Sequence, residues 1–237
     1  MVKLEHPEAP EYWTERYQNW QQELDDAVVE YGGYSNIPKR EKSKLIGRNN
    51  HESVKTVLLA SSYNKCAFCE TCPTAGSYIE IEHFWPKSVY PDSCYQWSNL
   101  LPSCTRCNNT KKAHDSKVDP IVNPYFDAIN EHLKFSMIRI TGLTEKGRKT
   151  ERKLQLNRSG LIKERSERLN DLDKLLINLE EQVQLYQQQT EKIVRDEIEN
   201  LVFELEDYFS PEITHSFFSR YTIESHQGYL QAKSLLN

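Results

Sequence analysis

The sequence predicts an α+β protein that is mainly helical, with one compact cysteine-rich segment between two helical flanks. Apolar residues recur at helical spacing in both flanks. Between residues 63 and 119 this periodicity stops, and cysteine, proline, asparagine and aromatic residues gather instead. We therefore divide the chain into a helical N-terminal region (1–62), a cysteine-rich core (63–120) and a C-terminal region (121–237).

The N-terminal region is expected to hold two helices. The first covers residues 9–31, where aromatic and leucine side chains fall near helical spacing, and Gly32-Gly33 supplies a stop signal. The second fits residues 38–62, although Gly47 weakens its middle.

The remaining elements are a mixture of short strands and longer helices. Residues 78–83 alternate apolar and polar side chains, as a short strand does, and a helix is expected to begin near Asn108. Residues 132–141 are expected to form a strand, although the alternation slips within them. A helix follows over 144–157. A long helix covers 160–208, with room for one break, and its apolar stripe over 169–183 indicates a core or a partner interface.

The composition and charge of the chain bear on whether it is a membrane, secreted or nucleic-acid-binding protein. No stretch approaches the roughly 20 apolar residues that a membrane span needs, and the printed start lacks the apolar core of a signal peptide, so we expect a cytoplasmic protein without a membrane contact. The net charge of −5 does not indicate a nucleic-acid binder. Residues 146–168, however, contain nine basic and three acidic residues. Such a run is either a solvated helix face or a contact for a nucleic-acid backbone.

The cysteines predict a structural zinc site. Cys66 and Cys69 form one CxxC pair, and Cys104 and Cys107 form a second. Two such pairs can supply the four thiolates of a tetrahedral zinc, which would stabilise a segment that has little apolar core. Redox pairs or free thiols are the alternative, but a redox CxxC is usually single and stands in a thioredoxin-like pattern that is absent here.

Two cysteines fall outside these pairs. Cys72 follows Cys69 closely enough to compete as a zinc ligand, and Cys94 is interpreted as a small buried side chain. Their roles stay open.

The two cysteine pairs enclose polar residues suited to cutting a phosphodiester bond. Histidine is a suitable general base near neutral pH, and His83 ends the predicted strand. Carboxylate and amide oxygens suit Mg²⁺ or Mn²⁺, and Glu82 and Asn108 are the candidate pair. Lys111 and Lys112 are either phosphate contacts or ordinary surface lysines.

The order of these motifs resembles that of the HNH endonucleases. It runs from CxxC to Glu82-His83, then to Asn99-Leu100, and ends in CxxC-Asn with Lys111 behind it. The resemblance implies a ββα-metal core, with His83 as general base, Glu82 and Asn108 as ligands of the catalytic metal, and Asn99 as a loop-fixing residue that orients His83. Family members more often have Asp at the position of Glu82 and His at the position of Asn108.

A narrower resemblance is to the PtuB family, the HNH subunits of Septu anti-phage systems, which also occur beside some retrons. It is carried by the run from Ile81 to Ser88, by Asn99-Leu100-Leu101, and by Lys153-Leu154-Gln155-Leu156-Asn157-Arg158. It implies a PtuA-like ATPase as partner. No Walker motif occurs in this chain, so ATP would be bound elsewhere.

The sequence thus predicts a metal-dependent nuclease that cuts DNA and acts as the effector of a defence system. Two alternatives stay open. One is a zinc-stabilised module that binds nucleic acid or protein without cutting. The other is a stand-alone HNH restriction nuclease, although no separate recognition domain can be identified.

Overall fold

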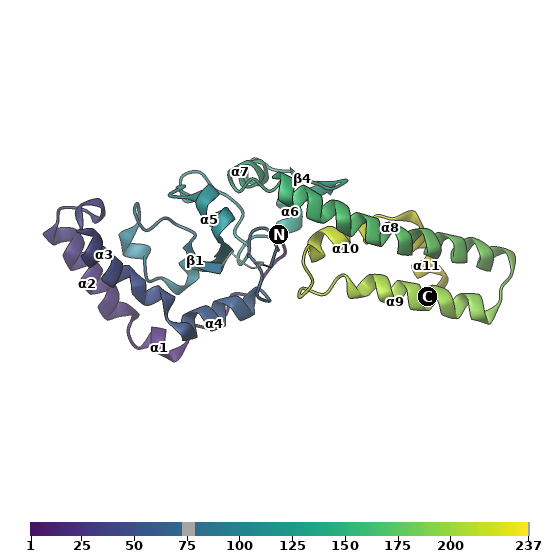
Figure 1. Ribbon diagram of the computed structural model, residues 1–237, viewed down its shortest axis with the longest axis horizontal. Helices are drawn as coiled ribbons and strands as arrows, with labels where there is room; N and C mark the ends of the chain where they lie inside the picture. Colours follow the sequence, from purple (N-terminus) through teal and green to yellow (C-terminus); the bar gives the residue numbers. More distant parts are fainter. Residues whose placement is uncertain (73–78, 237) are drawn as a thin grey trace.

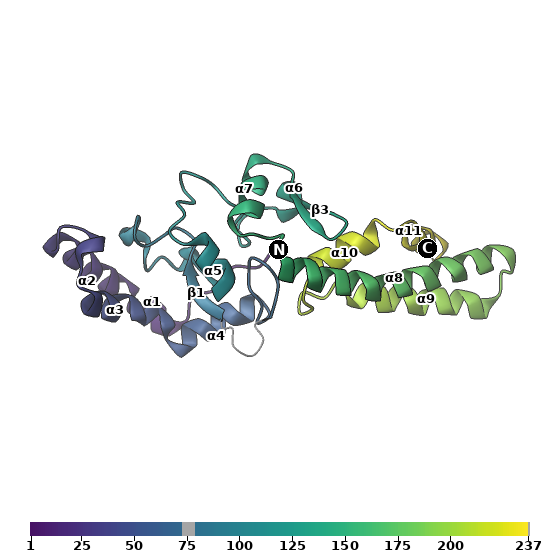
Figure 2. The same cartoon turned by 45° about the horizontal axis from the view of Figure 1, so that its top comes forward.

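The structure is a computed structural model that describes residues 1–72 and 79–236. Its elements are spread along one axis, with α2 (Tyr17–Glu30) and α3 (Lys39–Ile46) at one end and the helices of residues 159–236, the C-terminal arm, at the other (Figure 1). Between them lie α4 (Glu52–Ser61), β1 (Ile79–His83) and α5 (Thr105–Lys111). Turning the molecule shows the same order, with α6 (Ile129–His132) and α7 (Glu145–Lys153) above the middle (Figure 2). The chain is mainly helical with two small sheets, as the sequence predicts.

The N-terminal region forms four α-helices: α1 (Glu11–Thr14), α2 (Tyr17–Glu30), α3 (Lys39–Ile46) and α4 (Glu52–Ser61). Short 3₁₀ helices cover Tyr34–Asn36 and Gly47–Asn50. The single helix expected over 38–62 is therefore broken at Gly47, and the break turns Asn49 into the interior. Trp13, Trp20 and Leu58 form the core of this region together with Tyr95.

The middle of the molecule is a β-β-α unit. Strand β1 (Ile79–His83) pairs antiparallel with β2 (Leu100–Cys104), so that Ile79 lies opposite Cys104 and His83 opposite Leu100. Helix α5 (Thr105–Lys111) follows β2 without a loop and packs on both strands. The expected strand began at Tyr78, which lies outside the described residues. The expected helix begins three residues earlier than Asn108.

The loop between β1 and β2 contains two further 3₁₀ helices, over Pro91–Ser93 and Trp97–Asn99. Its aromatic residue Tyr95 is buried against the N-terminal helices. The loop is therefore fixed at both ends, by the β1–β2 pairing and by packing on the N-terminal region.

A second sheet follows helix α6 (Ile129–His132). Strands β3 (Leu133–Ser136) and β4 (Arg139–Gly142) pair as a tight hairpin. The single strand expected over 132–141 is wrong. The chain reverses at Met137, whose φ of 50° lies in the left-handed region, and this reversal explains why the alternation slips there. Helix α7 (Glu145–Lys153) packs against β4.

The C-terminal arm consists of α8 (Ser159–Gln188), α9 (Lys192–Asp207), α10 (Ser216–Glu224) and α11 (Gln227–Leu236). The long helix expected over 160–208 is interrupted once, between Gln188 and Lys192. The apolar stripe of α8 packs against α9 and α11 in a separate core that includes Leu172, Leu179 and Val183. None of the helices in the described ranges combines the length and apolarity that a bilayer crossing needs.

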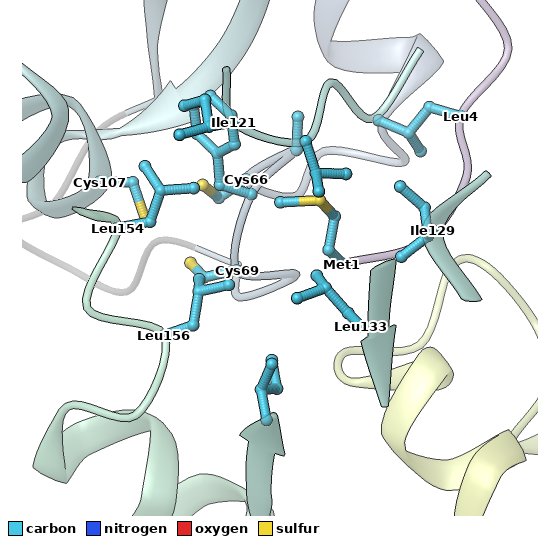
Figure 3. Close-up of a cluster of buried hydrophobic side chains, with 14 of the residues drawn as sticks. Met1, Leu4, Cys66, Cys69, Cys107, Ile121, Ile129, Leu133, Leu154 and Leu156 are labelled. Carbon is cyan, nitrogen blue, oxygen red and sulfur yellow. The ribbon is translucent and has the colours of Figure 1, made fainter. Parts of the chain in front are cut away.

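The core of the β-β-α unit extends into the chain beyond residue 120. Leu154, Leu156 and Ile121 pack around three of the buried cysteines, and Leu133 closes the same cluster (Figure 3). The cysteine-rich segment supplies few apolar side chains of its own. Its core is therefore completed by apolar side chains from the junction between α7 and α8.

Candidate active site and metal centre

Four cysteine side chains meet at the base of the β-β-α unit. Cys66, Cys69, Cys104 and Cys107 are buried, and their ligand atoms all lie within 4.8 Å of one another. The second pair spans the end of β2 and the first turn of α5, so the pairing of β2 with β1 helps to place it. The cysteine cluster predicted from the two CxxC pairs is confirmed.

The spacing of the sulfurs fits zinc. The Sγ atoms of Cys69 and Cys104 are 3.8 Å apart. Neighbouring sulfurs of a tetrahedral site with Zn–S bonds of about 2.3 Å have about this separation. The backbone N–H of Cys107 points to Sγ of Cys104 at 3.4 Å, and Nη1 of Arg158 lies 3.7 Å from Sγ of Cys107. These donors would offset the negative charge of four thiolates, so the cluster can bind a zinc ion.

The other two cysteines lie apart from this cluster. Cys72 is exposed, and Cys94 is buried in the loop that faces the N-terminal helices. Sγ of Cys94 lies 3.7 Å from Nε2 of His83. The structure thus places Cys94 as the small buried side chain that the sequence indicates.

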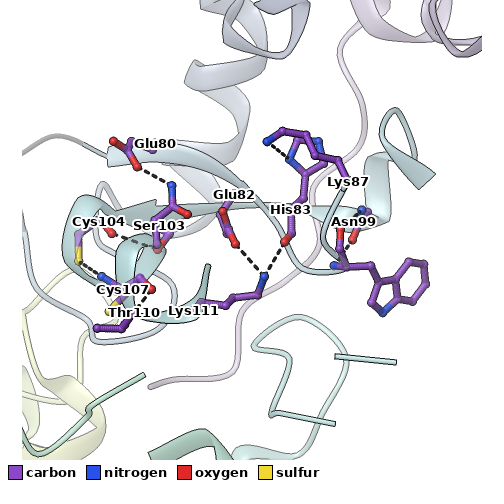
Figure 4. Close-up of polar contacts among 12 residues, drawn as sticks. Glu80, Glu82, His83, Lys87, Asn99, Ser103, Cys104, Cys107, Thr110 and Lys111 are labelled. Atoms are coloured by element: carbon purple, nitrogen blue, oxygen red, sulfur yellow. Dashed lines mark hydrogen bonds and ion pairs between the residues drawn. The ribbon is translucent and has the colours of Figure 1, made fainter. Parts of the chain in front are cut away.

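Two acidic residues of β1 face helix α5. Glu80 and Glu82 are two residues apart, so both carboxylates lie on one face of the strand, about 6.7 Å apart along it. Asn108 and Lys111 are three residues apart on α5 and also share a face. Nδ2 of Asn108 donates to Oε2 of Glu80 at 2.5 Å, and Nζ of Lys111 donates to Oε1 of Glu82 at 2.7 Å (Figure 4).

This arrangement differs from the expected pairing of Glu82 with Asn108. The Asn108 amide contacts Glu80 instead. The earlier residue on the helix meets the earlier carboxylate on the strand, and the later residue, Lys111, meets the later carboxylate, Glu82. Glu80 was not among the residues singled out from the sequence, although the period of two that predicts β1 places it beside Glu82. The donor set of two carboxylates and an amide oxygen on one face is of the kind that Mg²⁺ or Mn²⁺ prefers.

Glu82 and Lys111 form a buried ion pair. Lys111 is fully buried and also donates to the backbone carbonyl of His83 at 2.8 Å. Burial raises the pKa of Glu82 and lowers the pKa of Lys111, and the attraction between the two charges opposes both shifts. Lys111 is therefore an interior residue rather than a surface lysine. Lys112, the next residue, is exposed.

His83 projects from the opposite face of β1. Its ring is directed away from the Glu82 carboxylate and toward Lys87 (Figure 4). Nε2 lies 3.1 Å from the carbonyl oxygen of Cys94 and 3.0 Å from the carboxamide of Asn49. The Cys94 carbonyl only accepts and so favours a proton on Nε2, whereas the atom of Asn49 at this nitrogen is Nδ2, which donates. Among the described residues Oδ1 of Asn49 is buried without a partner, so turning the carboxamide by 180° would let Oδ1 accept from Nε2 as well and would leave the lone pair on Nδ1.

The pKa of His83 is lowered to about 3, mainly by burial and further by the charge of Lys87. The ring is therefore neutral at physiological pH, and it is a weak base as long as it stays buried beside the charge of Lys87. Asn49 is a contact that sequence reasoning missed. It comes from a segment 34 positions earlier in the chain, and no local pattern marks it.

Asn99 holds the loop that follows β1. Its Oδ1 accepts from the backbone N–H of Trp85 at 2.7 Å, and its Nδ2 donates to the carbonyls of Trp85 and Ser93. The side chain is buried and all its polar atoms are used. Asn99 thereby ties the chain just after His83 to the loop that carries Cys94.

Comparison with known proteins finds relatives that match part of the chain. The chain is 45% identical over 105 residues to "Septu protein PtuB" of Bacillus thuringiensis, which covers 44% of this chain and 41% of that protein. It is 30% identical over 155 residues to a second protein of that name from Bacillus mycoides, over 52% of each chain. A 101-residue match at 33% identity relates it to "Protein ea31" of Escherichia phage lambda, over 39% of this chain and 33% of that one.

The chain spans about half the length, or less, of the curated relatives that it matches. No protein-family model and no solved structure gives a significant match. The chain is therefore similar to proteins named PtuB over about half of its own length.

Proposed function

We propose that the chain is a metal-dependent HNH endonuclease that hydrolyses DNA phosphodiester bonds. The observation that carries the proposal is the end of β1. There the buried imidazole of His83, whose Nδ1 is directed toward Lys87, directly follows Glu82 in the chain, and Glu82 lies with Glu80 on the face of the strand toward α5. The cysteine cluster holds both ends of this unit together.

The residues divide the chemistry between them. Nδ1 of His83 takes a proton from the attacking water, the new O–P bond forms, and the bond from phosphorus to the 3′ oxygen breaks. The leaving oxygen takes a proton from solvent, so the products are a 5′-phosphate and a 3′-hydroxyl. Glu82 and Asn108, with Glu80 beside them, would hold Mg²⁺ or Mn²⁺, which when bound stabilises negative charge on the phosphoryl group.

Asn99 acts indirectly in this proposal. By tying the start of the β1–β2 loop, at Trp85, to the later part of the same loop, at Ser93, it keeps the Cys94 carbonyl next to Nε2 of His83. The ring orientation then directs Nδ1 toward Lys87, whose ammonium has to move away before a water can reach this nitrogen.

Cleavage by the purified chain tests the proposal. Wild type with Mg²⁺ or Mn²⁺ should degrade plasmid DNA, and His83→Ala should not. His132→Ala is a matched control, because His132 lies in α6, within a different part of the fold. Equal cleavage by wild type and His83→Ala would remove His83 from the mechanism. Binding of DNA without cleavage by any of these proteins would favour a zinc-stabilised binding module instead.

We further propose that the chain is the effector nuclease of an anti-phage defence system and works with a PtuA-like ATPase, in some genomes beside a retron. The similarity to proteins named PtuB supports this assignment. The C-terminal arm offers a surface for such a partner, since Ile177, Ile193 and Phe203 are more than half exposed on α8 and α9.

Co-purification with the product of an adjacent ATPase gene tests the partnership. Ile193→Asp together with Phe203→Asp should abolish the complex while leaving the zinc content unchanged. Sequence-specific cutting by the chain alone, without any ATPase, would instead favour a stand-alone restriction nuclease.

A further inference from the structure

Lys87 carries a positive charge that points at the candidate general base. It lies in the loop after β1, four positions beyond His83, and its side chain is half-buried. Nζ lies 3.4 Å from Nδ1 of His83, the ring nitrogen that carries the lone pair (Figure 4). The lysine therefore occupies the position where an attacking water would have to be deprotonated.

The charge of Lys87 is not balanced by the chain. Across residues 1–72 and 79–236, Lys87 makes no ion pair, and its hydrogen-bond partner is a ring nitrogen of His83. Lys111 lies nearby but is already paired with Glu82 and buried. An ammonium that is half-buried beside a neutral ring is stabilised by an anion that arrives from outside, and a phosphodiester supplies one.

A second cation, Lys117, comes from the segment after α5 and packs on the loop that follows β1. Nζ of Lys117 stands over the rings of Trp85 and Tyr90, at 4.3 and 4.0 Å from their centroids. Lys117 is exposed and makes no ion pair within the described part of the chain. The loop after β1 and the segment after α5 thus each contribute one lysine without an ion pair among the described residues, and both are cations of the kind that contact a nucleic-acid backbone.

We propose that Lys87 is a catalytic residue that binds a non-bridging oxygen of the scissile phosphate. This inference rests on the proposed nuclease function. When the phosphate binds, the Lys87 ammonium contacts the phosphate oxygen in place of Nδ1 of His83. Nδ1 can then accept the proton of the attacking water. The same ammonium stabilises the charge that develops on phosphorus-bound oxygen as the O–P bond forms and the bond to the 3′ oxygen breaks.

Lys87 takes the role expected of Lys111 for a geometric reason. Lys111 ends helix α5, and its side chain points inward to the Glu82 carboxylate of β1. There it cannot reach the phosphate backbone of a bound nucleic acid. Lys87 approaches from the loop side, next to the imidazole.

Cleavage kinetics form the first arm of the test. We expect Lys87→Met to lower kcat about 100-fold, in the range found when a single transition-state donor is removed, with KM changing much less. Lys87→Arg should restore a substantial part of kcat, since it keeps the charge. The exposed Lys134→Met on β3 is the matched control and should cleave like wild type. A wild-type kcat for Lys87→Met, or a rise in KM alone, would overturn the proposal.

Binding without cleavage forms the second arm and does not need the nuclease to be active. In a His83→Ala background, affinity for a short DNA duplex is measured by fluorescence anisotropy over a range of salt concentrations. Adding Lys87→Met should reduce the slope of log K against log salt concentration by about one, the change expected when one phosphate contact is lost. Adding Lys134→Met should leave the slope unchanged.

The two arms separate the two proposals. A wild type that does not cleave, with Lys87 still contributing a phosphate contact, removes the nuclease function and reduces Lys87 to a binding residue. Cleavage that depends on His83 but not on Lys87 retains the nuclease and refutes the role of Lys87. Circular-dichroism melting of each variant excludes a folding defect as the cause.

Discussion

Nζ of Lys111 lies 2.7 Å from Oε1 of Glu82, and both side chains are buried between β1 and α5. A charge pair of this kind adds little net stability over an apolar pair, but breaking it by removing one partner leaves a buried charge unpaired. The pair therefore links the fold of the β-β-α unit to the carboxylate proposed to bind the catalytic metal.

Lys111→Met should destabilise the protein by about 3–5 kcal/mol, because Glu82 is left as an unpaired buried acid. Combining it with Glu82→Gln should recover part of that loss. Urea unfolding followed by circular dichroism measures both effects. Lys112→Met, at the neighbouring exposed position, is the control and should leave the free energy of unfolding unchanged. Equal stability of Lys111→Met and wild type would show that the ion pair is not formed in solution.

The cysteine cluster should hold about one zinc ion per chain, measured by elemental analysis of purified protein. Cys69→Ser should lose that zinc and much of its cooperative unfolding, because the surrounding core depends on the metal. Cys72→Ser should keep the zinc, since its side chain is exposed outside the cluster. Loss of zinc in Cys72→Ser but not in Cys69→Ser would assign the fourth ligand to Cys72.

Glu80→Gln and Glu82→Gln should each weaken Mn²⁺ binding about tenfold or more, measured by calorimetry on zinc-loaded protein. The physical reason is that both carboxylates lie on the α5 side of β1, where each adds charge to the proposed site. Glu197→Gln, an exposed change in α9, serves as control. If Glu80→Gln binds Mn²⁺ as wild type does, its bond to Asn108 has only a structural role.

His83 should make the protein acid-sensitive. Its pKa is about 3 in the folded state and about 6.5 when unfolded, so between these values the unfolded state binds a proton that the folded state does not. Stability is therefore lost as pH falls below about 6.5, by up to about 1.4 kcal/mol per pH unit. Unfolding of His83→Gln should show a shallower dependence between pH 6.5 and 5. Parallel pH curves would mean that His83 is solvated in solution.

Asn99→Ala should cost about 1–3 kcal/mol, since it leaves buried backbone groups of Trp85 and Ser93 without partners. We also expect weaker DNA cleavage, because the loop that presents the Cys94 carbonyl to His83 loses its link to β1. Thermal melting and plasmid cleavage measure the two effects. Asn109→Ala, exposed on α5, should change neither. Normal cleavage by Asn99→Ala would separate loop stability from the orientation of His83.

Local patterns predicted the parts of the fold that depend on short spacing. The period of two over residues 79–83 marked β1, and the two CxxC pairs marked a cluster that the structure brings within 4.8 Å. The slip in alternation near Met137 was also visible, although its cause, a reversal into a hairpin, was not. Turns of this kind depend on one backbone conformation that the side-chain pattern records only indirectly.

The sequence by itself determined the candidate residues on which the proposal rests: four cysteines in two CxxC pairs, Glu82-His83 at the end of a strand, and Asn108 near the expected start of a helix. Only the tertiary structure decided how they meet. It turned Lys111 inward to Glu82, brought Asn108 to Glu80, and carried Asn49 across 34 positions to His83. Such contacts depend on how separate elements pack over one another, and the spacing of residues along a chain does not specify that packing.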